Sequence, residues 1–197
     1  YEMYLDLLEQ AVREIKGEEP ATRIDPEIGL KMEVLIPESY VPDPQQRMNL
    51  YKRLSRATEG SEIDGIEDER FDLYGKPPEQ VFHLIQVMRI RLAMKEIRIL
   101  RLDYNQQELI FTFDHDTPLN PQTLVNWTQN DRTVRLIPSD RLACTIGNVP
   151  PQMRIDRCFD VLKILREAID SGQERILPAR PADDGRPVPK FRGLKKR

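Results

Sequence analysis

The segment IPESYVPDPQQRMNLYKRL, residues 36–54, joins a proline-framed loop to an amphipathic helix. Pro37 and Pro42 restrict the loop to extended backbone geometry. Asp43 is expected to cap the helix, because its side chain can accept a hydrogen bond from an unpaired backbone N–H, and Pro44 suits the first helical position. The predicted inner face of this helix consists of Met48, Tyr51, Leu54 and Ala57. Nothing in the segment is typical of a catalytic site.

Helical and strand patterns continue on both sides of this segment. Upstream, residues 28–36 alternate between apolar and polar, which predicts a half-buried strand, and residues 1–16 have apolar positions at helical spacing. Downstream, a Ser-x-x-Asp signal predicts the start of a helix over residues 61–73, and Gly75 is expected to end it. Pro77 and Pro78 then start a long predicted helix that extends to about Ile97.

The second half of the chain contains two predicted strand pairs and two predicted helices. Residues 99–104 and 108–113 flank a polar turn and predict a hairpin, and residues 133–138 and 141–146 predict a second pair. A short helix is predicted to begin at Asn120-Pro121. The apolar residues of the last predicted helix include Ile155, Phe159, Leu162 and Ile169. Because short turns favour antiparallel pairing, we expect an α+β fold with short antiparallel strand pairs packed against several α-helices.

The same patterns predict the domain organisation. We expect one domain over residues 18–171, preceded by a helix over residues 1–17 and followed by a flexible, basic, proline-rich tail over residues 172–197. The first helix begins without an initiator methionine or a capping residue. We therefore expect the chain to be a fragment of a longer protein.

Composition and charge narrow the class of protein. No apolar run approaches the ~18 residues that a membrane span needs, and two cysteines among 197 residues form no disulfide framework, which favours a cytoplasmic location. The net charge of −3 is unevenly distributed. Residues 178–197 contain seven basic and two acidic side chains, a net charge of +5, so the rest of the chain carries −8. An acidic body suits docking on a basic protein surface better than binding nucleic acid.

The sequence contains no motif of the common enzyme sites. It has no phosphate-binding loop, no Gly-x-Ser-x-Gly and no His-Glu-x-x-His, so we predict no catalytic residue and no cofactor site. Asp114-His115-Asp116 is a possible metal-binding cluster, although a solvated turn is the simpler interpretation because further ligands are missing. His83 is predicted to lie on the surface. Cys144 and Cys158 are predicted to be packed apolar side chains.

One polar pattern is less ordinary. Acidic residues dominate the helix predicted over residues 61–73, with Arg70 as its one basic residue. The acidic set comprises Asp64, Asp68 and Asp72, which recur every fourth residue, together with Glu62, Glu67 and Glu69. Like charges four residues apart destabilise a helix by a few tenths of a kcal/mol each. The pattern indicates either a solvated helix face or a strip that docks on arginines of another module.

Three blocks of the sequence resemble the C-terminal module of the bacterial transcription-repair coupling factor (Mfd) family. The first, IPESYVPDPQQRMNLYKRLSRA, is similar to the family pattern Ile-Pro-x-x-Tyr-Ile-Pro-Asp followed by Arg-Leu-x-Leu-Tyr-Lys-Arg-Leu. The second, ERFDLYGKPPEQVFHLIQVMRIRLAMKEI, resembles a block that usually reads Glu-Leu-x-Asp-Arg-Phe-Gly-x-Leu-Pro, with Tyr74 in place of the Phe. The third, YEMYLDLLEQAVREIKGEE, resembles the helix that leaves the motor of these proteins.

The resemblance implies a regulatory role without chemistry in this chain. Family members are ATP-driven translocases on double-stranded DNA, which remove stalled RNA polymerase and recruit the excision-repair protein UvrA. Their ATP and Mg²⁺ belong to a motor upstream of this module. The C-terminal module docks on the N-terminal, UvrB-like module of the same protein and masks its UvrA-binding surface. Glu69 falls on the family's acidic docking position. An alternative is an autonomous nucleic-acid-binding module that acts through the basic tail.

Overall fold

The computed structural model describes residues 24–138 and 140–170. The elements in chain order are β1 (Glu27–Gly29), α2 (Pro44–Arg56), α3 (Gly60–Tyr74), α4 (Glu79–Ile97), β2 (Ile99–Tyr104), β3 (Glu108–Phe113), α5 (Pro121–Asn130), β4 (Val134–Ile137), β5 (Arg141–Thr145) and α6 (Pro151–Asp170). The helix predicted over residues 1–17 and the tail predicted over residues 172–197 lie outside the described residues.

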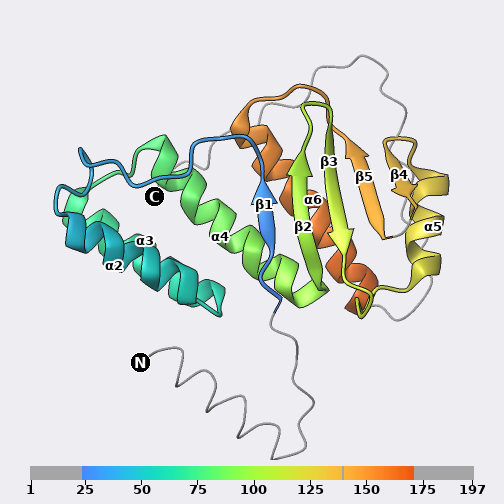
Figure 1. Ribbon diagram of the computed structural model, residues 1–197, viewed down its shortest axis with the longest axis horizontal. Helices are drawn as coiled ribbons and strands as arrows, with labels where there is room; N and C mark the ends of the chain where they lie inside the picture. Colours follow the sequence, from blue (N-terminus) through green and yellow to red (C-terminus); the bar gives the residue numbers. More distant parts are fainter. Residues whose placement is uncertain (1–23, 139, 171–197) are drawn as a thin grey trace, which may run out of the picture.

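The five strands form one mixed sheet in the order β1-β2-β3-β5-β4 (Figure 1). Both predicted hairpins are confirmed, since β2 pairs with β3 and β4 pairs with β5 in antiparallel fashion. An antiparallel β3–β5 pairing, with Leu109 opposite Cys144, joins the hairpins into one sheet. β1 runs parallel to β2, which the sequence did not indicate. The α+β prediction is confirmed, because this sheet packs against helices.

The strand predicted over residues 28–36 is wrong beyond Gly29. Lys31 adopts a positive φ of 51°, which turns the chain out of the sheet. The carbonyl oxygens of Leu30 and Lys31 accept hydrogen bonds from Nη1 of Arg154 on α6, at 3.1 and 2.8 Å. A side chain distant in sequence therefore satisfies backbone groups that a longer strand would have paired.

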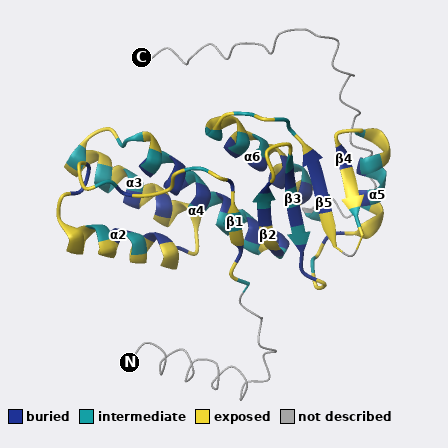
Figure 2. Ribbon diagram, turned by 45° about the horizontal axis from the view of Figure 1, so that its top comes forward, coloured by how far each residue is buried: buried dark blue, intermediate teal, exposed yellow. Residues whose placement is uncertain are grey.

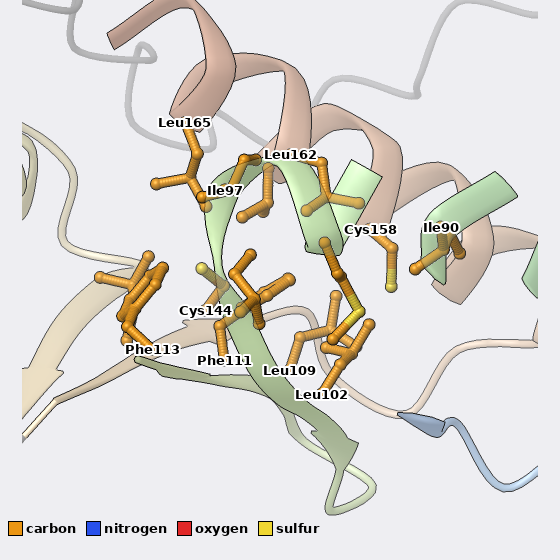
Figure 3. Close-up of a cluster of buried hydrophobic side chains, with 14 of the residues drawn as sticks. Ile90, Ile97, Leu102, Leu109, Phe111, Phe113, Cys144, Cys158, Leu162 and Leu165 are labelled. Atoms are coloured by element: carbon orange, nitrogen blue, oxygen red, sulfur yellow. The ribbon is translucent and has the colours of Figure 1, made fainter. Parts of the chain in front are cut away.

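α4 is the central helix, and two of its faces are buried in separate hydrophobic clusters. Val81, Leu84 and Ile85 pack with α2 and α3. Ile90 and Ile97 pack with α6 and the inner face of the sheet, and Figure 3 shows the α6 and strand side chains that meet them. α4 thereby fixes the α2–α3 pair at one end of the sheet layer (Figure 1).

The start of α2 follows the prediction, whereas the start of α3 does not. Asp43 Oδ1 accepts a hydrogen bond from the backbone N–H of Gln46 at 2.8 Å, and Pro44 is the first helical residue. The predicted Ser-x-x-Asp cap is wrong, because α3 begins at Gly60, before that serine. Instead, Oγ1 of Thr58 donates to Oε1 of Glu62 at 3.1 Å, which fastens the entry to α3.

Two predictions of side-chain position are also wrong. Met48 is 52% exposed, and Leu50, at 2%, is the residue of α2 that packs inward beside Leu54. His83 is 3% exposed rather than on the surface. It lies one turn before Val87, on the second buried face of α4, and the prediction had assumed a single buried face.

The two cysteines are packed core side chains, as predicted. Cys144 and Cys158 are 4% and 0% exposed, within the cluster between the sheet and α6 (Figure 3). Burial in apolar surroundings raises the pKa of the Cys144 thiol to about 12 and raises the pKa of Cys158 as well. Both thiols are therefore protonated near neutral pH. Among the described helices, none combines the length and apolar character required to cross a membrane.

Candidate interaction surface

α3 has one buried face and one face that is exposed to solvent. Ile63 and Ile66, which are 0% and 6% exposed, pack toward α2 and α4. The opposite face is open to solvent (Figure 2) and contains most of the acidic residues singled out in the sequence. We call the solvent side of α3, comprising Asp64, Asp68, Phe71 and Asp72, the outer face of α3. Its carboxylates differ in whether another side chain neutralises them.

One edge of this face is neutralised by α4. Nη2 of Arg89 contacts Oδ1 of Asp64 at 2.7 Å and Oε2 of Glu67 at 2.6 Å. Although burial alone would lower it, the pKa of Arg89 is raised because both carboxylates accept hydrogen bonds from its guanidinium. The guanidinium is therefore charged and joins α3 to α4, so Asp64 is part of an internal ion pair.

Glu69 is held by two internal arginines. Its Oε2 contacts Nη2 of Arg53 on α2 at 2.7 Å, and its Oε1 contacts Nη2 of Arg70 at 2.7 Å. The hydrogen bond from Arg53 is the largest cause of a lowered pKa at Glu69. The side chain is 42% exposed, so a partner could approach it. An incoming cation would then share a carboxylate that already has two partners.

Asp68 and Asp72 are different, because both are exposed and neither has an ion pair or hydrogen bond within residues 24–138 and 140–170. Glu62, the remaining predicted site residue, is exposed and bonded to Thr58 at the start of α3. The five predicted residues do lie together on α3. The structure divides them into two ion-paired carboxylates, one that fastens the helix start, and two that are unpaired in the described part of the chain.

Two exposed apolar residues accompany the unpaired carboxylates, and the sequence reasoning missed them. Phe71 is 56% exposed and Leu73 is 62% exposed. Phe71 lies three residues after Asp68 and Asp72 lies four residues after it, so both side chains neighbour Asp68 on the outer face. The sequence did contain a signal for the exposure of Phe71. This residue is large and apolar, but it is not part of the spacing that Ile63 and Ile66 define.

The end of α3 is firmly anchored beneath this face. The Tyr40 hydroxyl donates a hydrogen bond to the carbonyl oxygen of Gly75 at 3.1 Å, and the Tyr74 hydroxyl donates to Oε1 of Gln46 on α2. The guanidinium of Arg70 lies over the Tyr74 ring, 5.9 Å from its centroid. Gly75 ends the helix with φ 74° and ψ −158°, a conformation that suits glycine. The unpaired carboxylates are thus presented on a rigid element.

The position of Asp72 is electrostatically unfavourable for the isolated domain. Asp72 lies in the last turn of α3, where partially negative backbone carbonyls favour a basic side chain, and this turn contains none. Asp68 lies four residues from both Asp64 and Asp72, which adds repulsion. Local rules are most often broken where a residue serves binding rather than folding.

The second polar cluster singled out in the sequence, Asp114-His115-Asp116, is paired with the guanidinium of Arg98. Nη2 of Arg98 lies 3.2 Å from Oδ2 of Asp114 and 3.7 Å from Oδ2 of Asp116. Oδ1 of Asp114 accepts the backbone N–H of Asp116 at 2.8 Å, which is the largest cause of its lowered pKa. His115 is exposed. The Arg98 guanidinium thus pairs with both carboxylates that would have to bind a metal ion, which favours the solvated-turn interpretation.

The cavity enclosed by α2, α3 and α4 is too small for an organic ligand. Its volume is about 10 Å³, and Tyr40, Ile66 and Arg70 are among its lining residues. Small-molecule sites usually enclose about 300–1,000 Å³, whereas 10 Å³ corresponds to about one water molecule. The outer face of α3 is therefore the better candidate for function.

Known proteins resemble this chain in sequence and in fold. Residues 30–124 match the TRCF domain family. The chain is 34% identical over 143 residues to the transcription-repair-coupling factor of Myxococcus xanthus, covering 72% of this chain and 12% of that protein. It is 30% identical over 134 residues to the transcription-repair-coupling factor of Escherichia coli K12, covering 66% of this chain and 12% of that protein. The chain thus spans about an eighth of the length of these relatives.

A solved structure supports the fold assignment. The crystal structure of the C-terminal domain of a transcription-repair coupling factor superposes with a TM-score of 0.67. The match covers 77% of this chain and 98% of that domain at 14% sequence identity. At this identity the structural match establishes the arrangement of helices and strands.

Proposed function

This chain contains the TRCF domain of a transcription-repair coupling factor, and we propose that it is the C-terminal docking module of such a protein. In this proposal it binds the N-terminal, UvrB-like module of the same polypeptide and masks the surface that UvrA recognises. Its effect is to restrain the recruitment of the repair machinery until the module is released.

The outer face of α3 is the observation on which the proposal rests. It combines an exposed aromatic ring, Phe71, with two carboxylates, Asp68 and Asp72, that have no partner among the described residues. Arginine is the natural complement of such a face, because its guanidinium binds carboxylates in bidentate fashion and stacks on aromatic rings. We therefore propose that arginines of the UvrB-like module bind Asp68 and Asp72 over Phe71.

Glu69, Asp64 and Glu62 have supporting roles in this proposal. Glu69 remains a candidate contact at the edge of the interface, because its carboxylate is accessible although Arg53 and Arg70 already bind it. Asp64 acts with Arg89 to hold α3 against α4. Glu62 secures the start of α3 through Thr58. These contacts preorganise the outer face, which lowers the entropic cost of docking.

The activity of the whole protein is also a proposal. The chain spans about an eighth of its relatives, so we assign the ATP- and Mg²⁺-dependent motor on double-stranded DNA to other parts of the polypeptide. RNA polymerase and DNA would be engaged through those parts. For this chain we propose regulation of transcription-coupled nucleotide excision repair by protein–protein contact, without a catalytic step of its own.

A competition assay tests the proposal. The isolated UvrB-like module is titrated with the 197-residue chain by calorimetry, alone and in the presence of saturating UvrA. We expect saturable binding that UvrA abolishes, because both ligands would cover the same surface. Simultaneous binding of both ligands, or no binding of the chain at all, would contradict the masking role.

A further inference from the structure

The outer face of α3 has an electrostatic complement within the same chain. Residues 178–197 carry a net charge of +5, and five of their seven basic residues fall within the last eight positions. These five are Lys190, Arg192, Lys195, Lys196 and Arg197. The rest of the chain carries −8, and its unpaired carboxylates include Asp68 and Asp72 on a face that nothing described covers. We propose that the C-terminal tail binds the outer face of α3 and competes there with the UvrB-like module.

The length of the tail permits this contact. α6 ends at Asp170, and 27 residues follow it. An extended chain spans up to about 3.3–3.6 Å per residue, so the 20 residues between Asp170 and Lys190 reach roughly 65 Å. A domain of this size has a radius of gyration of about 15 Å. The basic end of the tail can therefore reach α3 even though α6 lies behind the sheet (Figure 1).

The side chains of the tail are chemically complementary to those of the outer face of α3. Lysine and arginine side chains of the tail can pair with Asp68 and Asp72 and offset the unfavourable charge of Asp72 at the C-terminal end of α3. Phe71 provides a ring over which a guanidinium can stack, and Phe191 provides an apolar contact among the basic residues of the tail. Because the pairs are exposed, the contact should weaken at high ionic strength.

Tethering makes even a weak contact consequential. A flexibly linked segment experiences an effective concentration in the millimolar range. A tail whose intrinsic dissociation constant is also millimolar or lower would occupy the outer face for half of the time or more. The inference rests on the proposed function in one respect, namely that the same face binds the UvrB-like module. The tail would then set the threshold at which that module can dock.

The experiment compares the full chain with a variant whose tail is neutralised. In this variant Lys190, Arg192, Lys195, Lys196 and Arg197 are all replaced by glutamine. Backbone amide NMR spectra of the two proteins should differ at α3 and not at β3 or β5, and the difference should vanish in about 0.5 M NaCl, where the Debye length falls to a few ångströms. When Asp68 and Asp72 are first replaced by asparagine, neutralising the tail should no longer change the α3 signals.

A second readout separates this inference from the proposed function. The neutralised variant should bind the UvrB-like module about two- to tenfold more tightly, because self-occupancy no longer competes. If the α3 signals of full and neutralised chains coincide while the UvrB-like module still binds α3, the tail contact is refuted and the docking role stands. If the signals differ but the UvrB-like module does not bind, the tail contact is supported and the docking role fails.

A nucleic-acid role for the tail is the remaining outcome. A 30-base-pair duplex is titrated into both proteins at low and moderate salt. Salt-dependent DNA binding that disappears in the neutralised variant, together with identical α3 signals in the two proteins, would overturn the inference and assign the tail to DNA.

Discussion

Reversing the two unpaired charges on α3 separates docking from folding. In the variant Asp68→Lys/Asp72→Lys, neither substitution breaks an ion pair or hydrogen bond with a described residue. The change at position 68 replaces the repulsion from Asp64, worth about 0.2–0.5 kcal/mol, by an attraction, whereas residues 68 and 72 still carry like charges. A lysine at position 72 also suits the C-terminal end of α3, by about 0.3–1 kcal/mol. The variant should therefore be as stable as the parent chain or slightly more stable.

Docking should respond in the opposite direction. At a desolvated interface, losing one partner of a charge pair typically costs about 2–5 kcal/mol. At 1.4 kcal/mol per tenfold change, the lower limit corresponds to affinity reduced about thirtyfold. Glu69→Lys should also weaken docking, but it would leave Arg53 and Arg70 without their shared carboxylate. The double variant at Asp68 and Asp72 is therefore the cleaner perturbation.

The assay is calorimetric titration of the UvrB-like module with each variant, after urea unfolding has confirmed that the fold is retained. A matched control is Asp156→Lys/Glu167→Lys, which changes the net charge equally at two exposed positions of α6. This control should bind like the parent, because α6 is remote from the outer face of α3 (Figure 1). Unchanged affinity of the folded α3 variant, or equal loss in the α6 control, would refute the reasoning.

Three further predictions concern the fold. Gly75→Ala should destabilise the chain by about 1–3 kcal/mol in urea unfolding, because φ 74° and ψ −158° suit glycine. Gly65→Ala should instead stabilise it by roughly 0.5–1 kcal/mol, because Gly65 lies in mid-helix with open space around it. Equal effects of the two substitutions would contradict the helix-end argument. Hydrogen bonds from Arg135 lower the pKa of Glu108, so this pair stabilises the fold above the ordinary carboxyl pKa and loses its effect as pH falls through the lowered value. Glu108→Gln should thus be less stable than the parent near pH 6, with a difference that shrinks toward pH 3; a difference independent of pH would exclude the ion pair as its cause. Burial raises the pKa of the Cys144 thiol to about 12, so Cys144 and the second buried thiol should react with a thiol reagent only upon unfolding. Fast reaction of the native chain would show that the core opens.

Local signals predicted much of this fold. β2 and β3 were bounded correctly because strand alternation and a polar turn are properties of neighbouring residues. The start of α2 followed from Asp43 and Pro44 for the same reason. The β3–β5 pairing and the parallel β1–β2 pairing join segments distant in sequence, and tertiary packing selects such partners.

The predictions that were wrong share one physical cause, which is packing between elements distant in sequence. His83 and Leu50 are buried because neighbouring elements cover helix faces that periodicity alone marked as outer or left unmarked. The acidic pattern located α3, but Arg53 and Arg89, which neutralise three of its carboxylates, come from other helices. Charge spacing along one helix cannot reveal such partners. The exposed Phe71 is what the structure adds to the acidic strip.

The most direct test of the docking role is amide hydrogen exchange of the chain, free and bound to the UvrB-like module. The account predicts slowed exchange in peptides that cover the second half of α3 and the loop after Gly75, where Asp68, Phe71 and Asp72 would be covered. Peptides from β4, β5 and α6 should exchange at the same rate in both states. Slowed exchange confined to the sheet or to α6, with α3 unchanged in a saturated complex, would contradict the assignment of the outer face of α3 as the docking surface.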